Sequence, residues 1–151
     1  MEAINDIADY ESSKYGNRIL ARAVAFQVLY QNDLNPDSRK DLTEEFLDEE
    51  LPEHDAVRQF AYKLIDGVGQ NRETIDTKLQ QSAHNWTLER MSAIDRNILR
   101  LAIYELFYMD TPSIIVINEA IEMAKKFSSK DSAAFVNGIL DKLKKTKKEK
   151  K

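Results

Sequence analysis

Apolar residues recur at helical spacing along almost the whole chain, and few residues interrupt the pattern. The 151 residues include only four glycines and three prolines. A β-sandwich or barrel needs turn residues at short intervals, and this chain does not supply them. The hydrophobic content of 42% suffices for a packed core and is too high for a disordered chain. We therefore predict an all-α fold of about seven helices, packed as two small bundles in one globular unit.

The helix boundaries are predicted from turn residues and capping signals. Helices are expected at residues 17–34, with Asn17 as N-cap, at 42–51, from 55 onward, and at 87–91. The helix that begins at residue 55 either continues past Gly67 and Gly69 or divides there. Three more helices are expected to start at Ser92 with Asp95, at Thr111 before Pro112, and at Ser128 with Asp131.

Two further residues are predicted to mark close packing. Gly138 lies inside the last helical pattern, where glycine costs about 1 kcal/mol relative to alanine. We expect another helix to approach it closely. Trp86, the single tryptophan, is predicted to anchor a junction between subdomains, because its large ring is usually buried against several elements.

Signals for catalysis, metal binding and membrane insertion are weak. The chain has no cysteine, which excludes disulfides and thiolate metal sites. His54 and His84 lie in no metal-ligand motif, and Gly67-x-Gly69 lacks the third glycine and the preceding strand of a phosphate-binding loop. The acidic amino terminus has no apolar signal region, and no apolar run is long enough to span a membrane. We expect a cytoplasmic protein without metal or cofactor that is not an enzyme.

The formal net charge of −4 is unusual for a nucleic-acid-binding protein, because general affinity for phosphate comes from cationic surface. The charges are unevenly distributed. Residues 33 to 55 carry ten acids and two bases, whereas residues 142 to 151 carry seven lysines and one glutamate. Any RNA binding is therefore expected to use a local cationic patch or to depend on a partner that supplies positive charge.

Four sequence blocks between residues 86 and 143 are the most specific feature: WTLER, DRNILRLAIYEL, INEAIEMAKKF and FVNGILDKL. Each combines an apolar stripe with polar residues that the stripe does not require, namely Arg90, Asp95, Arg96, Arg100, Glu105, Asn118, Glu119 and Asn137. In order, spacing and identity these blocks resemble the NusB family. The resemblance covers about residues 17–143, a predicted helical domain that binds RNA and protein. It leaves a flexible acidic extension at 1–16 and a lysine-rich tail at 144–151.

The resemblance implies transcription antitermination. A NusB-like protein would bind the single-stranded boxA element of nascent ribosomal transcripts together with the ribosomal protein NusE. The pair would then join RNA polymerase and other Nus factors. We expect at least about tenfold tighter boxA binding with NusE present, because both proteins hold one strand.

The first helix carries a candidate phosphate contact. Arg18 and Arg22 are one turn apart and suit successive phosphates, and Lys14 adds a third charge. A solvated helix end is the alternative interpretation. The resemblance implies an arginine-rich segment that touches RNA here, although Ile19 and Leu20 stand where further arginines are common. We expect Arg22→Ala to weaken RNA binding and to leave the melting temperature nearly unchanged.

The resemblance implies that two further groups of residues lie near the RNA. Gln27 and Tyr30 are neighbours along the first helix, suited to a base edge and to base stacking. Lys130, Asp131 and Phe135 open the last helix, where a helix N-terminus can meet a phosphate. From periodicity alone, Phe135 is a core residue, whereas Tyr30 fits the core and the RNA surface equally well.

Asp95, Glu105 and Glu119 are predicted to present an acidic surface to the basic partner NusE. Solvation of these side chains is the alternative. Arg96 and Arg100 are expected to be partly structural, with Glu105, Glu119 and Glu122 as candidate partners.

Two other functions remain open. One is a helical adaptor that binds only proteins. The other is a stand-alone relative of the NusB-like domain of ribosomal RNA cytosine methyltransferases, although the chain has no room for the cofactor-binding domain. A homodimer that covers the RNA surface is also compatible with the sequence.

Overall fold

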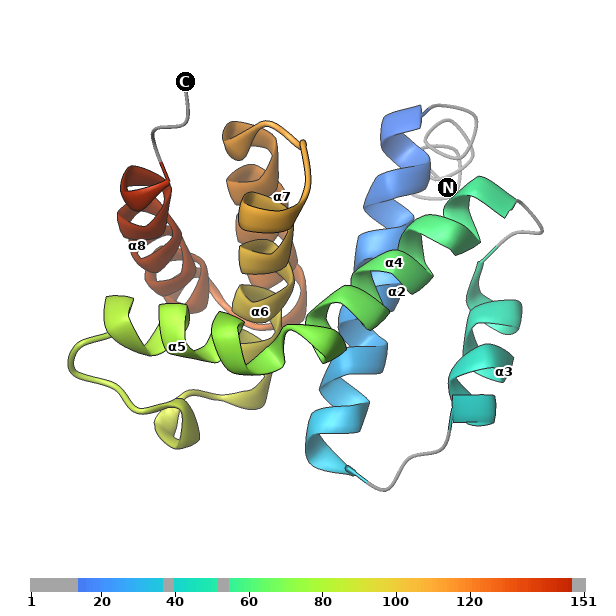
Figure 1. The fold of residues 1–151 in the computed structure, drawn as a ribbon, viewed down its shortest axis with the longest axis horizontal. Coiled ribbons are helices and arrows are strands. Elements are labelled where there is room, and N and C mark those ends of the chain that lie inside the picture. The colour runs from blue at the N-terminus through green and yellow to red at the C-terminus, as the bar shows by residue number, and fades with distance from the viewer. Residues whose placement is uncertain (1–13, 37–39, 52–54, 148–151) are drawn as a thin grey trace. The chain divides into compact units, whose positions relative to one another are not determined.

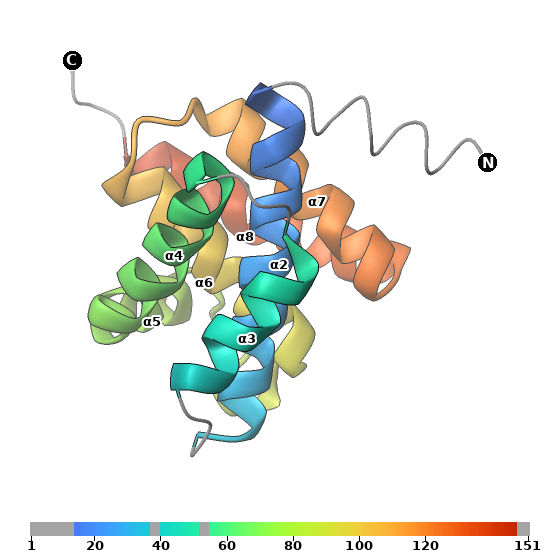
Figure 2. The ribbon, with the colours of Figure 1, turned by 90° about the vertical axis from the view of Figure 1, so that its right-hand side faces the viewer.

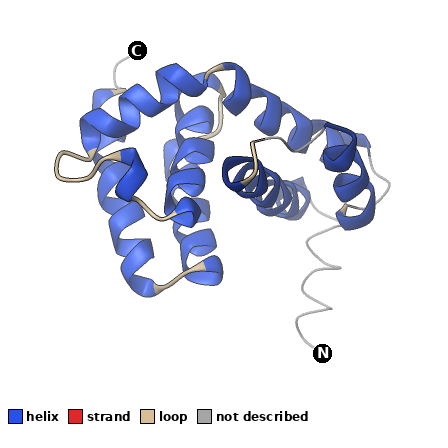
Figure 3. Ribbon diagram, turned by 90° about the horizontal axis from the view of Figure 1, so that it is seen from below, coloured by secondary structure: helices blue, strands red, loops and turns tan. Residues whose placement is uncertain are grey.

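The computed structural model describes residues 14–36, 40–51 and 55–147. These residues form seven α-helices and one 3-10 helix, and they contain no strand (Figure 3). The predicted all-α class and the number of helices are confirmed. The chain divides into two compact units, residues 1–66 and 67–151, which are described separately.

The first unit contains α2 (Lys14–Leu34), α3 (Lys40–Glu50) and most of α4 (Asp55–Gln70). Helix α2 is broadly apolar, so it is buried on more than one side, and α3 packs alongside it (Figure 2). The prediction of Asn17 as N-cap was wrong, since α2 already begins at Lys14. The buried side chains of the unit include Val24, Phe26, Leu47, Val57, Phe60 and Leu64.

The second unit contains α5 (Arg72–Ser82), the 3-10 helix η1 (Leu88–Arg90), α6 (Ala93–Tyr108), α7 (Ser113–Phe127) and α8 (Lys130–Thr146). Helix α6 packs against α5, α7 and α8 (Figure 1). Every residue from Asn97 to Leu106 is buried, as expected for a helix that others enclose. Helix α8 continues to Thr146, past the predicted domain boundary at residue 143.

The helical pattern after residue 55 divides at Asn71 into α4 and α5, and Gly67 lies in the last turn of α4. A β-carbon at Gly67 would overlap the ring of Tyr104 on α6. The glycine therefore permits a close approach between α4 and α6. Asn71, between the two helices, donates from its side chain to the carbonyl of Gly67 at 2.9 Å.

The expectation of a close approach at Gly138 was wrong. A β-carbon built there has no neighbouring atom within 4 Å, and the residue is exposed on α8. The glycine that permits close packing in this unit is Gly67, whose partner is distant in the sequence.

Of the other three capping predictions, one was confirmed and two were wrong. The Ser92 hydroxyl accepts from the backbone N–H of Asp95 at 3.0 Å, as predicted for the start of α6. The cap of α8 is Ser129, which accepts from the N–H of Ser132 at 3.1 Å, rather than Ser128. Helix α7 begins at Ser113 after Pro112, and the Thr111 hydroxyl donates instead to Glu105.

Within the described part of the chain, no helix combines the length and apolar character needed to cross a membrane.

Candidate nucleic-acid interface

Arg18 and Arg22 share one aromatic ring. Their guanidinium carbons lie 4.7 Å and 5.5 Å from the centroid of the Phe60 ring on α4. Both distances suit cation–π attraction, in which the negative face of the ring stabilises the cation. Phe60 was not among the predicted site residues, because nothing in the local pattern connects it with residues about forty positions earlier.

The two arginines differ in burial. Arg22 is only 4% exposed, whereas Arg18 is half-buried. A buried guanidinium contributes to packing and loses solvation unless neighbouring groups replace it. Its burial therefore argues against the expectation that removing Arg22 leaves the melting temperature unchanged. The backbone of Lys14 opens α2, and its side chain lies outside the described residues.

Gln27 and Tyr30 are both half-buried on α2. The Tyr30 ring lies 6.0 Å from the buried Phe26 ring, at an interplanar angle of 32°. Part of the tyrosine therefore packs against the interior while part remains accessible. This environment is compatible with either core packing or base stacking.

The start of α8 presents Lys130 and Asp131 to solvent, and Phe135 is half-buried behind them. The Phe135 ring meets the Trp86 ring edge to face, with centroids 6.0 Å apart and an interplanar angle of 69°. Trp86 is 47% exposed, so it is not the enclosed anchor that the sequence predicted. Its aromatic contact lies within the second unit.

A hollow of about 350 Å³ opens beside these rings. Its lining comes from the segment around η1, from the first turn of α6 and from the first turns of α8. The lining residues are Trp86, Arg90, Met91, Ser92, Asp95, Ser129, Asp131, Ser132 and Phe135. Two helix N-termini therefore face a cavity that also carries an aromatic pair.

A hydrogen-bonded network fixes the wall of this hollow. The Gln80 side chain on α5 donates to the Trp86 carbonyl at 2.6 Å and accepts from the Leu88 N–H at 3.1 Å. The Arg96 guanidinium donates to the carbonyls of Leu88 at 2.8 Å and Met91 at 3.1 Å. These bonds hold η1 against α5 and α6, so the Trp86 backbone is fixed before any ligand binds.

The structural role expected of Arg100 is confirmed, and it includes a partner that was not predicted. Its buried guanidinium donates to both carboxylate oxygens of Asp76 on α5, at 2.8 Å and 3.1 Å. The predicted partners were Glu105, Glu119 and Glu122. A bidentate hydrogen bond of this kind suits the planar guanidinium. Asp76 was not predicted as a partner because it is 24 residues away in the sequence.

The three predicted partner-binding acids do not share one environment. Glu105 is 1% exposed and accepts from the Thr111 hydroxyl at 3.0 Å. The prediction that Glu105 belongs to a docking surface was therefore wrong, because the part of α6 that carries it is enclosed by other helices. Glu119 and Asp95 are half-buried. The Oδ1 atom of Asp95 is buried and, among the described residues, has no hydrogen-bond partner.

The fold and these surfaces define a class of protein. It is an all-helical protein with arginines on one unit and a partly exposed aromatic pair on the other, and cationic and aromatic side chains are the kinds of contact that single-stranded nucleic acids use. The family model described as "NusB family" matches residues 19–145. The chain belongs to the NusB family.

Individual relatives agree with this assignment. The transcription antitermination protein NusB of Geobacter sulfurreducens is 46% identical over 129 residues, which cover 85% of this chain and 94% of the relative. A solved structure of T. maritima NusB is 38% identical with a TM-score of 0.78, and the match covers 85% of this chain and 90% of the other. A structure of the antitermination factors NusB and NusE in complex with double-stranded RNA is 30% identical, also with a TM-score of 0.78. It covers 86% of this chain and 97% of its own.

Proposed function

We propose that this protein is a transcription antitermination factor. It binds boxA-type RNA of nascent ribosomal transcripts together with the basic protein NusE, and the pair joins RNA polymerase and other Nus factors. The observation that carries the proposal is the similarity along most of the chain to proteins named for this function. The proposed activity involves no covalent step and no cofactor, and it takes place in the cytoplasm, where transcripts emerge.

The proposed RNA contacts lie in two sets. Arg18 with Lys14 offers phosphate contacts at the start of α2, and Gln27 and Tyr30 follow on the same helix. Lys130, Asp131 and Phe135 form the other set at the start of α8. Asp95 and Glu119 remain candidates for contact with NusE, whereas the buried Glu105 is no longer one.

The charges of the protein support joint binding of RNA by this protein and NusE. The formal net charge is −4, and Arg22 is buried, so the proposed contact on α2 has few cations to neutralise phosphates. Each phosphate contact contributes about 0.7 to the salt slope for a single strand. One or two contacts predict a slope of only about −0.7 to −1.4 and weak binding by the protein alone. A basic partner on the same strand supplies the missing charge.

The test is an RNA-binding titration with and without NusE. We expect boxA affinity to rise at least about tenfold when NusE is added, with little rise for a scrambled RNA of the same length. A duplex form of boxA is the third probe, because the related complex contains double-stranded RNA. Equal boxA affinity with and without NusE would contradict joint binding of the RNA by the two proteins.

One observation favours the second candidate, a helical adaptor that binds only proteins. The burial of Arg22 leaves a thinner cationic row on α2 than the sequence suggested. The adaptor interpretation predicts NusE binding with no difference between boxA and scrambled RNA, so the same titration separates the two functions.

A further inference from the structure

The last turns of α8 begin the densest run of positive charge in the sequence. Residues 136–147 contain four lysines and a single acid, Asp141. Residues 142–151 carry seven lysines and one glutamate, a net charge of +6, so the remaining residues carry −10 of the total of −4. Most of the chain therefore repels phosphates, whereas this end of α8 attracts them.

The first of these lysines stand on a regular helix. Helix α8 continues to Thr146, and Leu143 is buried between Lys142 and Lys144. Lys142, Lys144 and Lys145 are exposed. Residues three positions apart are neighbours on a helix surface, so a strand that passes Lys142 also passes Lys145. The helix therefore holds several ammonium groups within reach of one phosphate chain.

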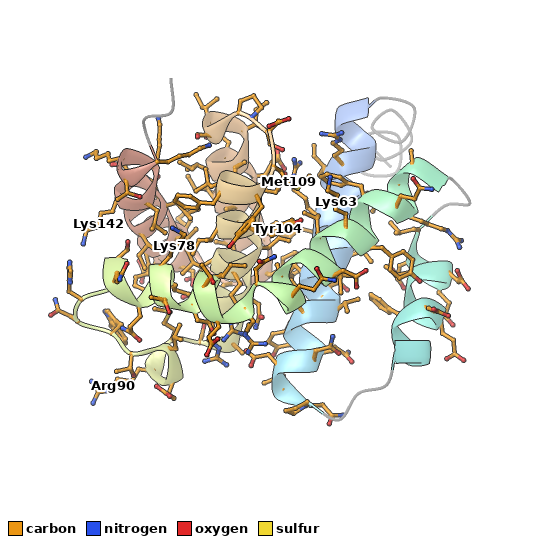
Figure 4. The ribbon with its side chains drawn as sticks, viewed as in Figure 1. Lys63, Lys78, Arg90, Tyr104, Met109 and Lys142 are labelled. Carbon is orange, nitrogen blue, oxygen red and sulfur yellow. The ribbon has the colours of Figure 1, made fainter. Side chains whose placement is uncertain are left out.

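Two lysines of the second unit have partners within the fold. Lys142 Nζ donates to the carbonyl of Ser82, at the end of α5, at 3.3 Å. Lys78 Nζ, also on α5, lies 4.3 Å from the centroid of the Phe107 ring on α6. Lys78 and Lys142 are labelled in Figure 4, which shows the helices that carry them. These two side chains contribute to the packing of α5 against α6 and α8.

The lysines that follow are less engaged. Lys145 forms an ion pair with Asp141 at 3.6 Å, in which both side chains are more than half exposed. Exposed pairs of this kind contribute little to stability. Lys144 and Lys147 form no ion pair with any residue that the structure describes. Three cations are therefore available to a ligand at the end of α8.

The helix dipole accounts for only part of this charge. Cations are favoured near the C-terminus of a helix, and Lys144 and Lys145 lie in the last turn of α8. The effect falls off within that turn, so lysines beyond residue 147 gain little from it. The excess of positive charge thus calls for a second explanation.

A nucleic acid fits this surface better than an acidic protein does. Protein interfaces depend on buried aromatic or apolar anchors. Among the described residues, the exposed large hydrophobic side chains are Leu34, Trp86, Tyr108 and Ile114, and none of them lies on α8. Lysine presents a point charge without a fixed fork of donors, which suits contacts to phosphates that carry no sequence information.

We propose that the last turns of α8 bind the phosphates of RNA that flanks the boxA element. The inference rests on the proposed function, in which the start of α8 contacts boxA itself. The helix has 17 residues and is about 25 Å long, so the strand has to continue a few nucleotides beyond boxA to reach the lysines. Binding at the start of the helix raises the effective concentration of the flanking strand at its end.

The length of the RNA tests the proposal. In the presence of NusE, boxA alone is compared with boxA that carries about ten further uridines on its 5′ or its 3′ side, enough to follow α8. We expect one extended RNA to bind about three- to tenfold more tightly, with a salt slope steeper by about 1.4 to 2.1 for two or three lysine contacts. Adenosines in place of the uridines should give the same gain, because phosphates are read without regard to sequence.

Two double variants separate charge from structure. Lys144→Gln with Lys145→Gln removes two charges and should abolish most of the gain from the extension, with a smaller effect on boxA alone. Lys144→Arg with Lys145→Arg is the matched control, which keeps both charges and should keep the gain. Glutamine and arginine are both good helix formers, and thermal melting checks that each variant is folded.

Three results would overturn the flanking site. The first is that neither extension raises the affinity of the parent protein. The second is an equal loss of affinity for boxA and for extended RNA in the glutamine variant, which would give the lysines a general electrostatic or structural role. The third is a glutamine variant that binds every RNA like the parent, which would leave the surface to an acidic partner protein.

All three results leave the proposed function intact as long as boxA itself is bound. Absence of any boxA binding, with and without NusE, overturns both proposals.

Discussion

The two units of this protein both place charged side chains beside aromatic rings, and they use the combination differently. In the first unit, Phe60 is 8% exposed and holds two guanidinium groups. In the second unit, Trp86 is 47% exposed, and the nearby Asp95 has an acceptor with no partner in the part of the chain that the structure describes. The first arrangement has most of its interactions satisfied within the fold, whereas the second leaves interactions to be completed.

This difference teaches that charge and aromaticity do not by themselves identify an interface. The arginine row was the stronger candidate from sequence, because cations bind phosphates. The structure shows that one of its members is buried. What distinguishes a binding surface from a packed one is whether the polar atoms already have partners.

The largest expected effect is the loss of Phe60. Phe60→Ala should lower the free energy of unfolding by about 3 kcal/mol, because a cavity replaces the buried ring and two arginines lose their cation–π contact. Phe135→Ala should cost only about 1 kcal/mol, since that ring is half-buried and less apolar area is exposed on its removal. Urea denaturation measures both values. Equal losses would remove the distinction between the two regions.

A smaller effect is expected for Arg22. Arg22→Ala should lower the free energy of unfolding by about 1–3 kcal/mol, because the buried guanidinium leaves its neighbours without a partner. The control Arg90→Ala, at an exposed position, should change stability by no more than about 0.5 kcal/mol. If Arg22→Ala instead melts like the parent protein and weakens RNA binding, Arg22 belongs to the interface after all.

The smallest effect concerns Tyr62 on α4, whose neighbours also belong to the first unit. Burial, followed by the nearby carboxylates of Glu44 and Asp48, raises the pKa of the Tyr62 phenol above its ordinary value of 10.0. The folded state therefore keeps this proton to higher pH than the unfolded state does. The resulting stabilisation is complete below the ordinary pKa and is lost as pH rises through the raised one.

Tyr62→Phe removes this titration. Between about pH 9 and about pH 11, the parent protein should lose stability more steeply than the variant. The difference between their unfolding free energies at the two pH values isolates Tyr62 from the other groups that titrate there. Parallel slopes would show that folding does not raise the pKa of the Tyr62 phenol.

Local sequence patterns predicted the helices well, because helical periodicity and capping depend on residues three or four positions apart. The Ser92 cap is an example. The cap of α8 was misplaced by one residue, since Ser128 and Ser129 are chemically equivalent candidates and only backbone geometry selects Ser129. The neighbouring residues alone do not show which of the two serines caps the helix.

The site was less predictable because its decisive contacts join distant residues. Arg100 is paired with Asp76, Arg18 packs on Phe60, and Glu105 is enclosed although acids usually remain exposed. A single sequence carries no direct signal for such pairs. The resemblance to the NusB family indicated which segments matter but not which of their side chains are accessible.

The contact between Gly67 and the Tyr104 ring leads us to expect that these two positions vary as a pair. Among divergent relatives, a side chain at the first position is compatible with this packing only where the second carries a smaller residue. Evolution would have to pass through both replacements, and the intermediate with alanine opposite tyrosine would be disfavoured. The glycine is therefore expected to persist in any lineage that keeps the tyrosine, whatever RNA or protein its members bind.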